Sequence, residues 1–523
     1  MLDLLITGGV VMNGTGGPWF RADVGIDEGR IAFIGDSAAV EARKAIDAEG
    51  LVVAPGFIDI HSHSDSNLLI NPAAESKVRQ GVTTEVIGQC GVSAAPVQPE
   101  QIEEMKEHLP DSPDLQDLCW SSMADYLSLL ESRGVAVNCV ALAGHGNIRR
   151  LVVGEEDREP TPDELDRMCD LLRETMEAGA AGMSSGLIYP PGVYSDTAEL
   201  IALARVLGEC GGIYFTHIRN EGDRHEESLR EAVEIGRGGD CPVQVSHFKL
   251  VGEANWGGAD RALRQLESAR AEGVDVTADQ YPYIATATGL TASLPAWAHD
   301  GGREAMLGRL RDRDARRVLK EEMPDGGWDR LVISQVGSEA NRTCEGMSVA
   351  DIADERGLDP RDTVFNLLLE EDGNVGSVRF ALSEEDVREI MAHPLVMVGS
   401  DGSALAPRGI LGRGKPHPRS YGTFPRVLGK YAREEGIIPL ETAIAKMTSR
   451  PAARLGLWDR GLLLPGFWAD VVVFNPDTVR DRATFTDPHR FPVGVEVVLV
   501  NGEIVVADDG QRDVRPGQVL RKD

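Results

Sequence analysis

The sequence predicts an α/β fold: a parallel (β/α)8 barrel of the TIM type, accompanied by a small β-sandwich built from both ends of the chain. Three observations support this prediction. Between residues 54 and 459, eight short apolar segments alternate with stretches of helical periodicity. Both chain ends instead alternate apolar runs with glycine-rich turns. No G-x-G-x-x-G follows the first central strand, which disfavours a doubly wound sheet.

The β-sandwich is expected to comprise residues 1–53 and 460–523. The first of these segments reads LLITGG, DVGID-EGR-IAFIGD and LVV, with turn residues between the apolar runs. Near the other end, ADVVVF precedes VEVVLV-NG-EIVVAD, in which Asn501-Gly502 is a strong hairpin sequence. Two β-segments at opposite ends of the chain are therefore expected to pair into one domain.

The barrel is expected to comprise residues 54–459. Pieces such as TPDELDRMCDLLRETMEAGA supply helix formers between the apolar segments. The expected strands are Gly56–Ile60, Thr83–Ile87, Val137–Ala143, Ala181–Ser184, Gly212–Thr216, Val243–Ser246, Val274–Ala278 and Leu395–Gly399.

More than a hundred residues separate the seventh expected strand from the eighth. This interval contains glycine-rich and charged stretches such as AHDGGREAMLGRLRDRDARR, and a structureless loop of such length would be unusual. We expect residues 285–345 to form an inserted subdomain that can cover the mouth of the barrel.

The composition excludes several classes of partner. Lys and Arg total 53 against 84 Asp and Glu, a formal charge of −31. Such a balance repels phosphate backbones and anionic membrane surfaces, so no nucleic acid and no membrane partner is expected. A small anionic substrate would need basic groups close to it.

The cysteines and the N-terminus indicate a cytoplasmic protein. Seven cysteines in 523 residues are sparse, odd in number and irregularly spaced, so reduced thiols are expected. The first residues carry no basic leader, and the sequence has no apolar run of 18 residues.

Polar side chains with metal-binding chemistry follow five of the expected strands. In a (β/α)8 barrel these strand ends meet at the face where active sites form. Imidazole, thiolate and carboxylate together suit zinc. Singly, each has an ordinary alternative: a structural histidine, or a cysteine acting as a small buried hydrophobe. The candidate residues are His61, His63, Cys90, His217, His247 and Asp401.

The chain resembles the D-aminoacylase (N-acyl-D-amino-acid deacylase) family of the amidohydrolase superfamily. The first-strand sequence APGFIDIHSH and the C-terminal GLLLPGFWADVVVF are similar to those of the superfamily. The closer likeness lies in GVTTEVIGQCGVSAAP, SSGLIYPPG, FTHIRNE, VSHFK, DQYPY, GSDG and HPRSYGTFPRVLG, which follow one another in the family's order.

The resemblance implies two metal positions. Cys90, His217 and His247 match a tightly held zinc ion, and His61 and His63 match a second, weaker one. Many relatives in the superfamily bridge two metals with a carbamylated lysine. Here no expected strand before the fifth ends in lysine, and Cys90 matches the bridging ligand instead.

Asp401 matches the catalytic aspartate of the family. A carboxylate at this position can take a proton from a metal-activated water and deliver it to the leaving amine. It can equally serve as a further ligand or as a hydrogen-bond partner of a histidine.

The substrate's α-carboxylate is expected to contact Lys249, Tyr281 and Arg419, which match the family's carboxylate pocket. Arg419 can hold a carboxylate bidentately, whereas Lys249 taken alone would be read as a solvated surface charge. Tyr189 is expected to line the site, with a packed loop tyrosine as the alternative.

Two departures from the family put the substrate in question. Ala287 stands where relatives often have serine, with Thr286 or Thr288 as replacements, and the 402–416 loop is longer than in the best-known members. It contains Arg408, Arg413 and Lys415.

The function expected is zinc-dependent hydrolysis of N-acyl-D-amino acids to a carboxylate and a free D-amino acid. A cyclic-amide hydrolase of the hydantoinase or dihydroorotase type is one alternative. A non-catalytic assembly protein on the same fold is another, although a scaffold has no need for converging ligands.

Overall fold

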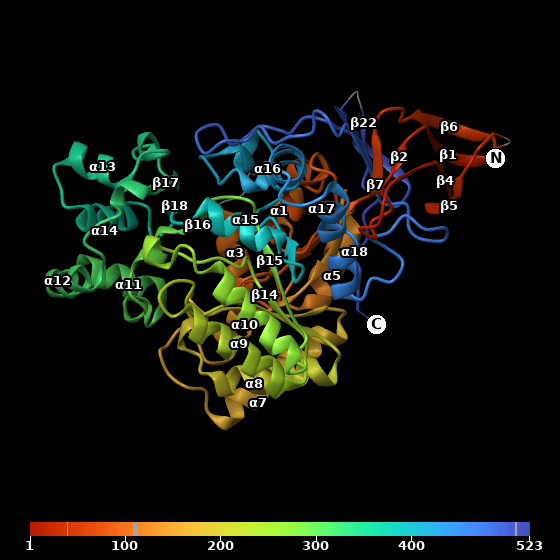
Figure 1. Cartoon of the computed structure of the whole chain (residues 1–523). Helices are drawn as coiled ribbons and strands as arrows, with labels where there is room; N and C mark the ends of the chain where they lie inside the picture. Colours follow the sequence, from red (N-terminus) through yellow and green to blue (C-terminus); the bar gives the residue numbers. More distant parts are fainter. Residues whose placement is uncertain (39, 108–112, 508–509, 523) are drawn as a thin grey trace.

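The protein is described here by a computed structural model that covers residues 1–38, 40–107, 113–507 and 510–522 (Figure 1). Parallel strands surrounded by helices form the centre of the molecule. The antiparallel strands of the two chain ends lie at one side, and a unit made from residues 285–380 projects at the other.

The parallel strands follow one another in chain order. β8, β9 and β10 form one sheet, and β11 to β15 with β19 form a second. Only Leu142 separates β10 from β11, and a parallel bridge joins Ser62, after β8, to Gly402, after β19. The first and last parallel strands therefore lie side by side. Their bounds are β8 (Phe57–Asp59), β9 (Val82–Ile87), β10 (Asn138–Ala141), β11 (Ala143–Gly144), β12 (Gly182–Gly186), β13 (Ile213–His217), β14 (Val243–Val245), β15 (Val276–Gln280) and β19 (Val396–Val398).

All eight expected strand segments overlap these strands, with bounds that differ by at most two residues. The seventh is displaced at both ends, since the strand begins at Val276 and the sequence pattern suggested Val274. Val274 and Val276 alternate with Asp275 directly after Gly273, so the apolar pattern alone did not mark where the strand begins.

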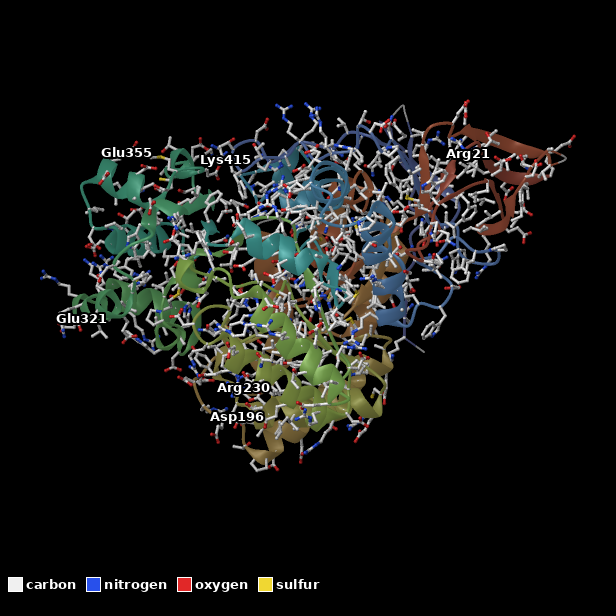
Figure 2. The ribbon with its side chains drawn as sticks, in the orientation of Figure 1. Arg21, Asp196, Arg230, Glu321, Glu355 and Lys415 are labelled. Atoms are coloured by element: carbon white, nitrogen blue, oxygen red, sulfur yellow. The ribbon has the colours of Figure 1, made fainter. Side chains whose placement is uncertain are left out.

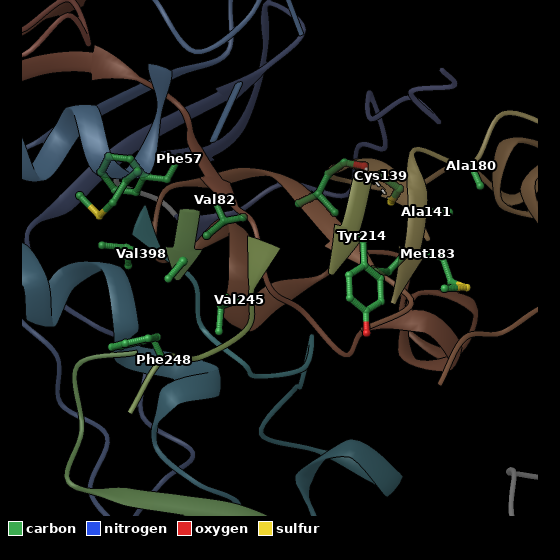
Figure 3. Packing of buried hydrophobic residues seen from close by; sticks show 14 of the residues in the cluster. Phe57, Val82, Cys139, Ala141, Ala180, Met183, Tyr214, Val245, Phe248 and Val398 are labelled. Atoms are coloured by element: carbon green, nitrogen blue, oxygen red, sulfur yellow. Dashed lines mark hydrogen bonds between the residues drawn. The ribbon is translucent and has the colours of Figure 1, made fainter. Parts of the chain in front are cut away.

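Both faces of the parallel strands are buried. Met397 contributes to one apolar cluster with Ile58, Val86 and Phe215. Its neighbour Val398 contributes to a second cluster, whose side chains pack on the surrounding helices (Figure 3). Burial on both faces explains why apolar residues occupy adjacent positions in these strands and are not confined to alternate ones.

The helices around the strands begin at side-chain caps that the sequence supplies. Thr161 accepts a hydrogen bond from the backbone N–H of Glu164, whose side chain bonds back to Thr161, and Asp196 caps the next helix. These helices are α1 (Asp65–Ile70), α2 (Glu75–Val78), α3 (Pro99–Glu107), α4 (Pro113–Gln116), α5 (Met123–Arg133), α6 (His145–Val152), α7 (Pro162–Glu177), α8 (Thr197–Glu209), α9 (His225–Gly239), α10 (Ala259–Ala271), α15 (Glu384–Ala392), α16 (Arg419–Arg426), α17 (Leu440–Met447) and α18 (Ser449–Leu455).

The two chain ends share one apolar cluster between two sheets. One sheet has the order β5-β4-β1-β6, and the other has the order β23-β22-β21-β20-β7-β2-β3. Asn501 and Gly502 both have positive φ and join β21 to β22, as the hairpin sequence predicted. The strands are β1 (Leu2–Thr7), β2 (Val10–Val11), β3 (Phe20–Arg21), β4 (Asp23–Asp27), β5 (Arg30–Gly35), β6 (Ala42–Asp47), β7 (Val52–Pro55), β20 (Val471–Phe474), β21 (Val495–Val500), β22 (Glu503–Ala507) and β23 (Gly510–Gln511).

The unit between β15 and β19 has its own antiparallel sheet, in the order β16-β18-β17, and its own apolar cluster. The sequence pattern placed the end of this unit at residue 345, but its central strand β18 runs to Phe380. The pattern stopped short because β18 pairs with strands distant in the chain. The elements are β16 (Ala285–Gly289), α11 (Gly302–Arg311), α12 (Arg313–Glu322), β17 (Leu331–Gln335), α13 (Val349–Arg356), α14 (Pro360–Glu370) and β18 (Gly376–Phe380).

Among the helices of the described residues, none has the length and apolar character needed to cross a membrane.

Candidate metal centre and substrate cavity

The carboxyl ends of the parallel strands bring the six candidate residues together. His217 is the last residue of β13, and the other five stand within a few residues after β8, β9, β14 and β19. Five of the six line one cavity of about 1050 Å³. The sixth, His61, is fully buried next to them. The chemistry expected from their spacing is thus gathered at one place.

Three histidines, His61, His217 and His247, lie close to the Cys90 sulfur or to one another. The His61 Nε2 atom lies 3.4 Å from Cys90 Sγ, and the His247 Nε2 atom lies 3.3 Å from it. The ring centroids of His217 and His247 are 4.3 Å apart. Asp401 completes the cluster, since its Oδ1 atom is 2.9 Å from His63 Nε2 and 3.5 Å from His61 Nε2.

Three residues of this cluster have left-handed backbone conformations. The φ angles are 54° for Cys90, 37° for His247 and 50° for Asp401. Such angles cost free energy for any residue with a Cβ atom and are retained where surrounding structure enforces them. The local backbone is therefore strained at the side chains that would bind a metal or transfer a proton.

The electrostatics favour ionised ligands. Burial raises the pKa of the Cys90 thiol, but the charges of His247 and His61 outweigh burial and hold that pKa well below its usual range. Burial likewise raises the pKa of Asp401, and the Arg419 guanidinium and His247 outweigh it, so the pKa falls well below normal. A thiolate and a carboxylate are the forms that bind metal ions.

The ring nitrogens of His217 are a further observation that supports a bound metal ion. His217 is buried, and neither of its ring nitrogens has a hydrogen-bond partner among the described residues. The nearest carboxylate oxygen, Glu221 Oε2, is 3.7 Å from Nε2. An imidazole that makes no hydrogen bond is costly to bury unless a ligand satisfies it. Two overlapping groups have ligand atoms within 4.8 Å of one another: His61, Cys90, His247 and Asp401, and His217, Glu221 and His247.

Two acidic residues that the sequence reasoning did not assign hold the histidines in place. Asp279 Oδ1 is 3.1 Å from His61 Nδ1 and accepts the backbone N–H of His247 at 2.8 Å. Glu221 Oε1 is 3.1 Å from His247 Nδ1. Both lie in quoted segments, DQYPY and FTHIRNE, but the sequence did not show which way either side chain points.

A buried charge network supports the turn that carries Asp401. Lys77 Nζ, fully buried, donates to Asp59 Oδ2 at 2.7 Å and to the carbonyl oxygen of Gly402 at 3.1 Å. The Asp401 N–H donates to the His61 carbonyl at 2.8 Å. Glu85 is the one charged residue of the buried strand sequence VTTEVI and is a sequence clue to this network, since its Oε2 atom is 3.4 Å from Lys77 Nζ.

The three residues expected to bind a carboxylate lie together. The Arg419 guanidinium is 4.9 Å from the centroid of the Tyr281 ring, and Lys249 Nζ is 5.6 Å from it. The Tyr281 hydroxyl is buried and has no hydrogen-bond partner among the described residues. An unsatisfied donor between two cations is a suitable place for an anionic group.

Both cations also have anionic neighbours. Arg419 Nη1 is 2.7 Å from Asp401 Oδ2, so the arginine pairs with the candidate catalytic carboxylate. Lys249 donates to Glu221 and to the His247 carbonyl, the latter at 2.9 Å. Lys249 is buried, which excludes the alternative of a solvated surface charge.

Tyr189 and β16 line the cavity beside His217. The Tyr189 ring centroid is 5.1 Å from that of His217, and its hydroxyl is 3.1 Å from Thr288 Oγ1. Arg419 Nη2 donates to the carbonyl of Ala287 at 3.3 Å. Because this contact uses the backbone carbonyl of residue 287, it does not depend on whether that residue is alanine or serine.

The longer 402–416 loop bridges the strand ends and the inserted unit. Arg408 forms an ion pair with Glu75 of α2, and the Lys415 N–H donates to the Ser334 carbonyl at 2.6 Å. Arg413 lines the cavity and is exposed. The loop therefore closes one side of the cavity.

The arrangement of ligands at the ends of parallel strands is that of a metal-dependent hydrolase. Residues 44–506 match the amidohydrolase family, so the chain belongs to that family.

Full-length relatives are more specific. The chain is 40% identical to an N-acyl-D-glutamate deacylase of Alcaligenes xylosoxydans xylosoxydans, over 100% of this chain and 97% of that protein. It is 38% identical to a D-aminoacylase of the same organism, over 99% of this chain and 98% of that one. The crystal structure of N-acyl-D-glutamate deacylase from Bordetella bronchiseptica, complexed with zinc and a phosphonate mimic of the tetrahedral intermediate, superposes with a TM-score of 0.85 at 39% identity and 100% coverage of both chains.

Proposed function

We propose that the protein hydrolyses N-acyl-D-amino acids to a carboxylate and a free D-amino acid in a zinc-dependent reaction. The observation that supports this most directly is the cluster around Cys90, in which buried histidines meet a thiolate beside the unpartnered nitrogens of His217. Full-length similarity to N-acyl-D-amino-acid deacylases supports the linear amide as substrate.

Cys90, His217 and His247 are the proposed ligands of a tightly held zinc ion, and His61 and His63 those of a second, weaker position. When bound, zinc polarises a carbonyl and lowers the pKa of water toward neutrality. Asp279 would fix the orientation of His61, and Glu221 that of His247.

Asp401 is the proposed general base and acid. Its ionised carboxylate, 2.9 Å from His63 and 2.7 Å from Arg419, takes a proton from the attacking water. It then delivers that proton to the leaving nitrogen, so that the product departs as an amine.

The substrate's α-carboxylate is proposed to bind between Arg419, Lys249 and the Tyr281 hydroxyl. Holding this group at one end and the scissile carbonyl at the other fixes the orientation of the bond to be cleaved. Tyr189 is proposed to line the acyl side, where its hydroxyl is close to Thr288.

The hydantoinase-like alternative is not favoured, because the full-length relatives are named for linear substrates and Cys90 stands in place of a bridging lysine. The assembly-protein alternative does not account for strained, ionised residues around one cavity.

The architecture we propose is an eight-stranded barrel over residues 54–459 with a β-sandwich from residues 1–53 and 460–523, and the unit beginning at residue 285 as a lid. The bridge between Ser62 and Gly402 supports closure of the barrel. Seven free cysteines support a reducing, cytoplasmic setting.

The test is a panel of N-acetyl and longer N-acyl amino acids, D against L, with zinc-loaded protein. We expect hydrolysis of D substrates at least about 100-fold faster than of their L enantiomers. Turnover of cyclic amides with no turnover of any linear D substrate would overturn the proposal.

A further inference from the structure

The inserted unit places an arginine in the cavity wall that the reaction above does not use. Arg379, on the central strand β18, lies opposite Thr286 of β16 and Leu331 of β17 in the sheet register. All three residues line the cavity that also contains Cys90 and Asp401. Residues directly opposite one another in an antiparallel sheet share a face, so Arg379 presents its side chain with Thr286.

Within the described part of the chain, Arg379 has no counter-ion. Among the residues that the structure describes, no carboxylate, carbonyl or ring contacts its guanidinium, although the side chain is partly buried. Burial alone lowers the pKa of this group from its usual value, with no neighbouring charge to offset it. An arginine withdrawn from water without a partner is unfavourable unless a ligand supplies the anion.

The acidic side chains that line the cavity do not act as counter-ions for Arg379. Glu221 pairs with Lys249, and Asp401 pairs with Arg419, so both acidic side chains of the lining are engaged elsewhere. In a chain with a net charge of −31, an arginine that lines a cavity without a carboxylate partner among the described residues is unusual.

Arg379 is close to the proposed α-carboxylate pocket. Arg419 donates to the Ala287 carbonyl at 3.3 Å, and Thr286, the residue opposite Arg379, immediately precedes Ala287. A substrate held at Arg419 therefore has its Cα atom near β16, and its side chain starts from that same atom.

We infer that Arg379 binds a second carboxylate of the substrate, located on the amino-acid side chain, so that the enzyme prefers N-acyl derivatives of D-glutamate or D-aspartate. This inference rests on the proposed function and names the substrate class of the same site. Arg379 is then a specificity residue supplied by the inserted unit, whereas the strand ends supply the chemistry.

The experiment compares N-acetyl-D-glutamate with N-acetyl-D-glutamine, which has nearly the same shape and no side-chain charge. We expect kcat/KM of the parent enzyme to be at least about 10-fold higher for the glutamate derivative. In Arg379→Met, kcat/KM for that derivative should fall about 10- to 100-fold, mainly through KM, and change less than about 3-fold for the glutamine derivative.

Two controls accompany this comparison. Arg379→Lys keeps the charge but loses the bidentate geometry, and it should recover part of the preference. Arg230→Met makes the same chemical change on the exposed surface of α9 and should leave both substrates unaffected (Figure 2). Retained activity on N-acetyl-D-glutamine shows that the variant protein is folded.

The source of the carboxylate is tested with N-succinyl-D-alanine and its terminal amide. If Arg379→Met impairs the succinyl acid and leaves N-acetyl-D-glutamate unaffected, Arg379 reads the acyl group and the inference is wrong. Equal losses on glutamate and glutamine derivatives would also overturn it. Both results leave deacylation itself intact, whereas failure of the parent enzyme on every N-acyl-D-amino acid overturns the proposed function instead.

D-Glutamate should inhibit the parent enzyme more strongly than D-glutamine does, and Arg379→Met should remove that difference.

Discussion

The cavity has two structurally different regions: a floor, formed by residues at the ends of the parallel strands, and a wall, formed by the inserted sheet β16-β18-β17. At the floor, side chains from the ends of five parallel strands form a dense network in which Cys90 contacts two histidines and Asp401 contacts both a histidine and Arg419. At the wall, the inserted sheet contributes hydroxyls and the unpaired Arg379. The floor has a strained backbone and many side-chain contacts, while the wall is a regular sheet on which the guanidinium of Arg379 has no partner among the described residues. This contrast indicates that the reaction is fixed by the floor and the choice of substrate by the wall.

Removing the proton acceptor from the floor should have the largest effect. Asp401→Asn preserves the shape of the side chain but cannot accept a proton, so kcat should fall about 100- to 10,000-fold. Zinc content, measured on the same preparation, should remain near that of the parent. Near-normal kcat with zinc retained would mean that Asp401 only orients His63 and Arg419.

Removing ligands from the floor should release metal. Cys90→Ala and His217→Ala should each lose most of the tightly bound zinc, as determined by metal analysis after gel filtration. The parent should unfold at a higher temperature with zinc than without it, because a ligand that binds only the folded state stabilises it. The matched control is Cys241→Ala, a buried free cysteine outside the cluster. Zinc content unchanged in both ligand variants would contradict the assignment.

At the boundary between floor and wall, Arg419→Met should weaken substrates that carry an α-carboxylate. A charge-assisted hydrogen bond contributes about 1.5–3 kcal/mol, so kcat/KM should fall roughly 10- to 150-fold. The same substrate amidated at the α-carboxyl should be poor for the parent and much less sensitive to the substitution. Equal losses on acid and amide would show that Arg419 acts through its ion pair with Asp401.

The smallest of these effects should come from behind the floor. Asp279→Asn removes the charge beside His61 Nδ1 but leaves the cluster around Cys90 in place. Loss of such a supporting carboxylate typically costs about 10- to 100-fold in metal affinity or activity. Zinc titration into stripped protein separates these two outcomes. An unaltered affinity together with unaltered kcat would show that the hydrogen bond to the His247 N–H suffices.

Sequence reasoning was accurate where local patterns govern structure. The apolar segments located the parallel strands, and the placement of His61, Cys90, His217 and Asp401 after them predicted the cluster, because parallel strands end at one edge. It did not assign Asp279 or Glu221, since their roles depend on side-chain direction across neighbouring strands. It also ended the inserted unit too early and overlooked Arg379, because β18 pairs with strands far back in the chain. Ser377 lies opposite Ile333, 44 residues earlier, and Phe380 lies opposite Ala285, 95 residues earlier.

The inserted unit enters and leaves the molecule at a single point. Ala285, its first strand residue, lies opposite Phe380, its last, in the register of β16 and β18. A segment whose two ends are adjacent can be exchanged for one of different length or sequence while the spacing of β15 and β19 stays the same. The unit can therefore be replaced as a whole. Grafting the corresponding segment of a relative between Ala285 and Phe380 should transfer that relative's substrate selectivity without any change in the parallel strands.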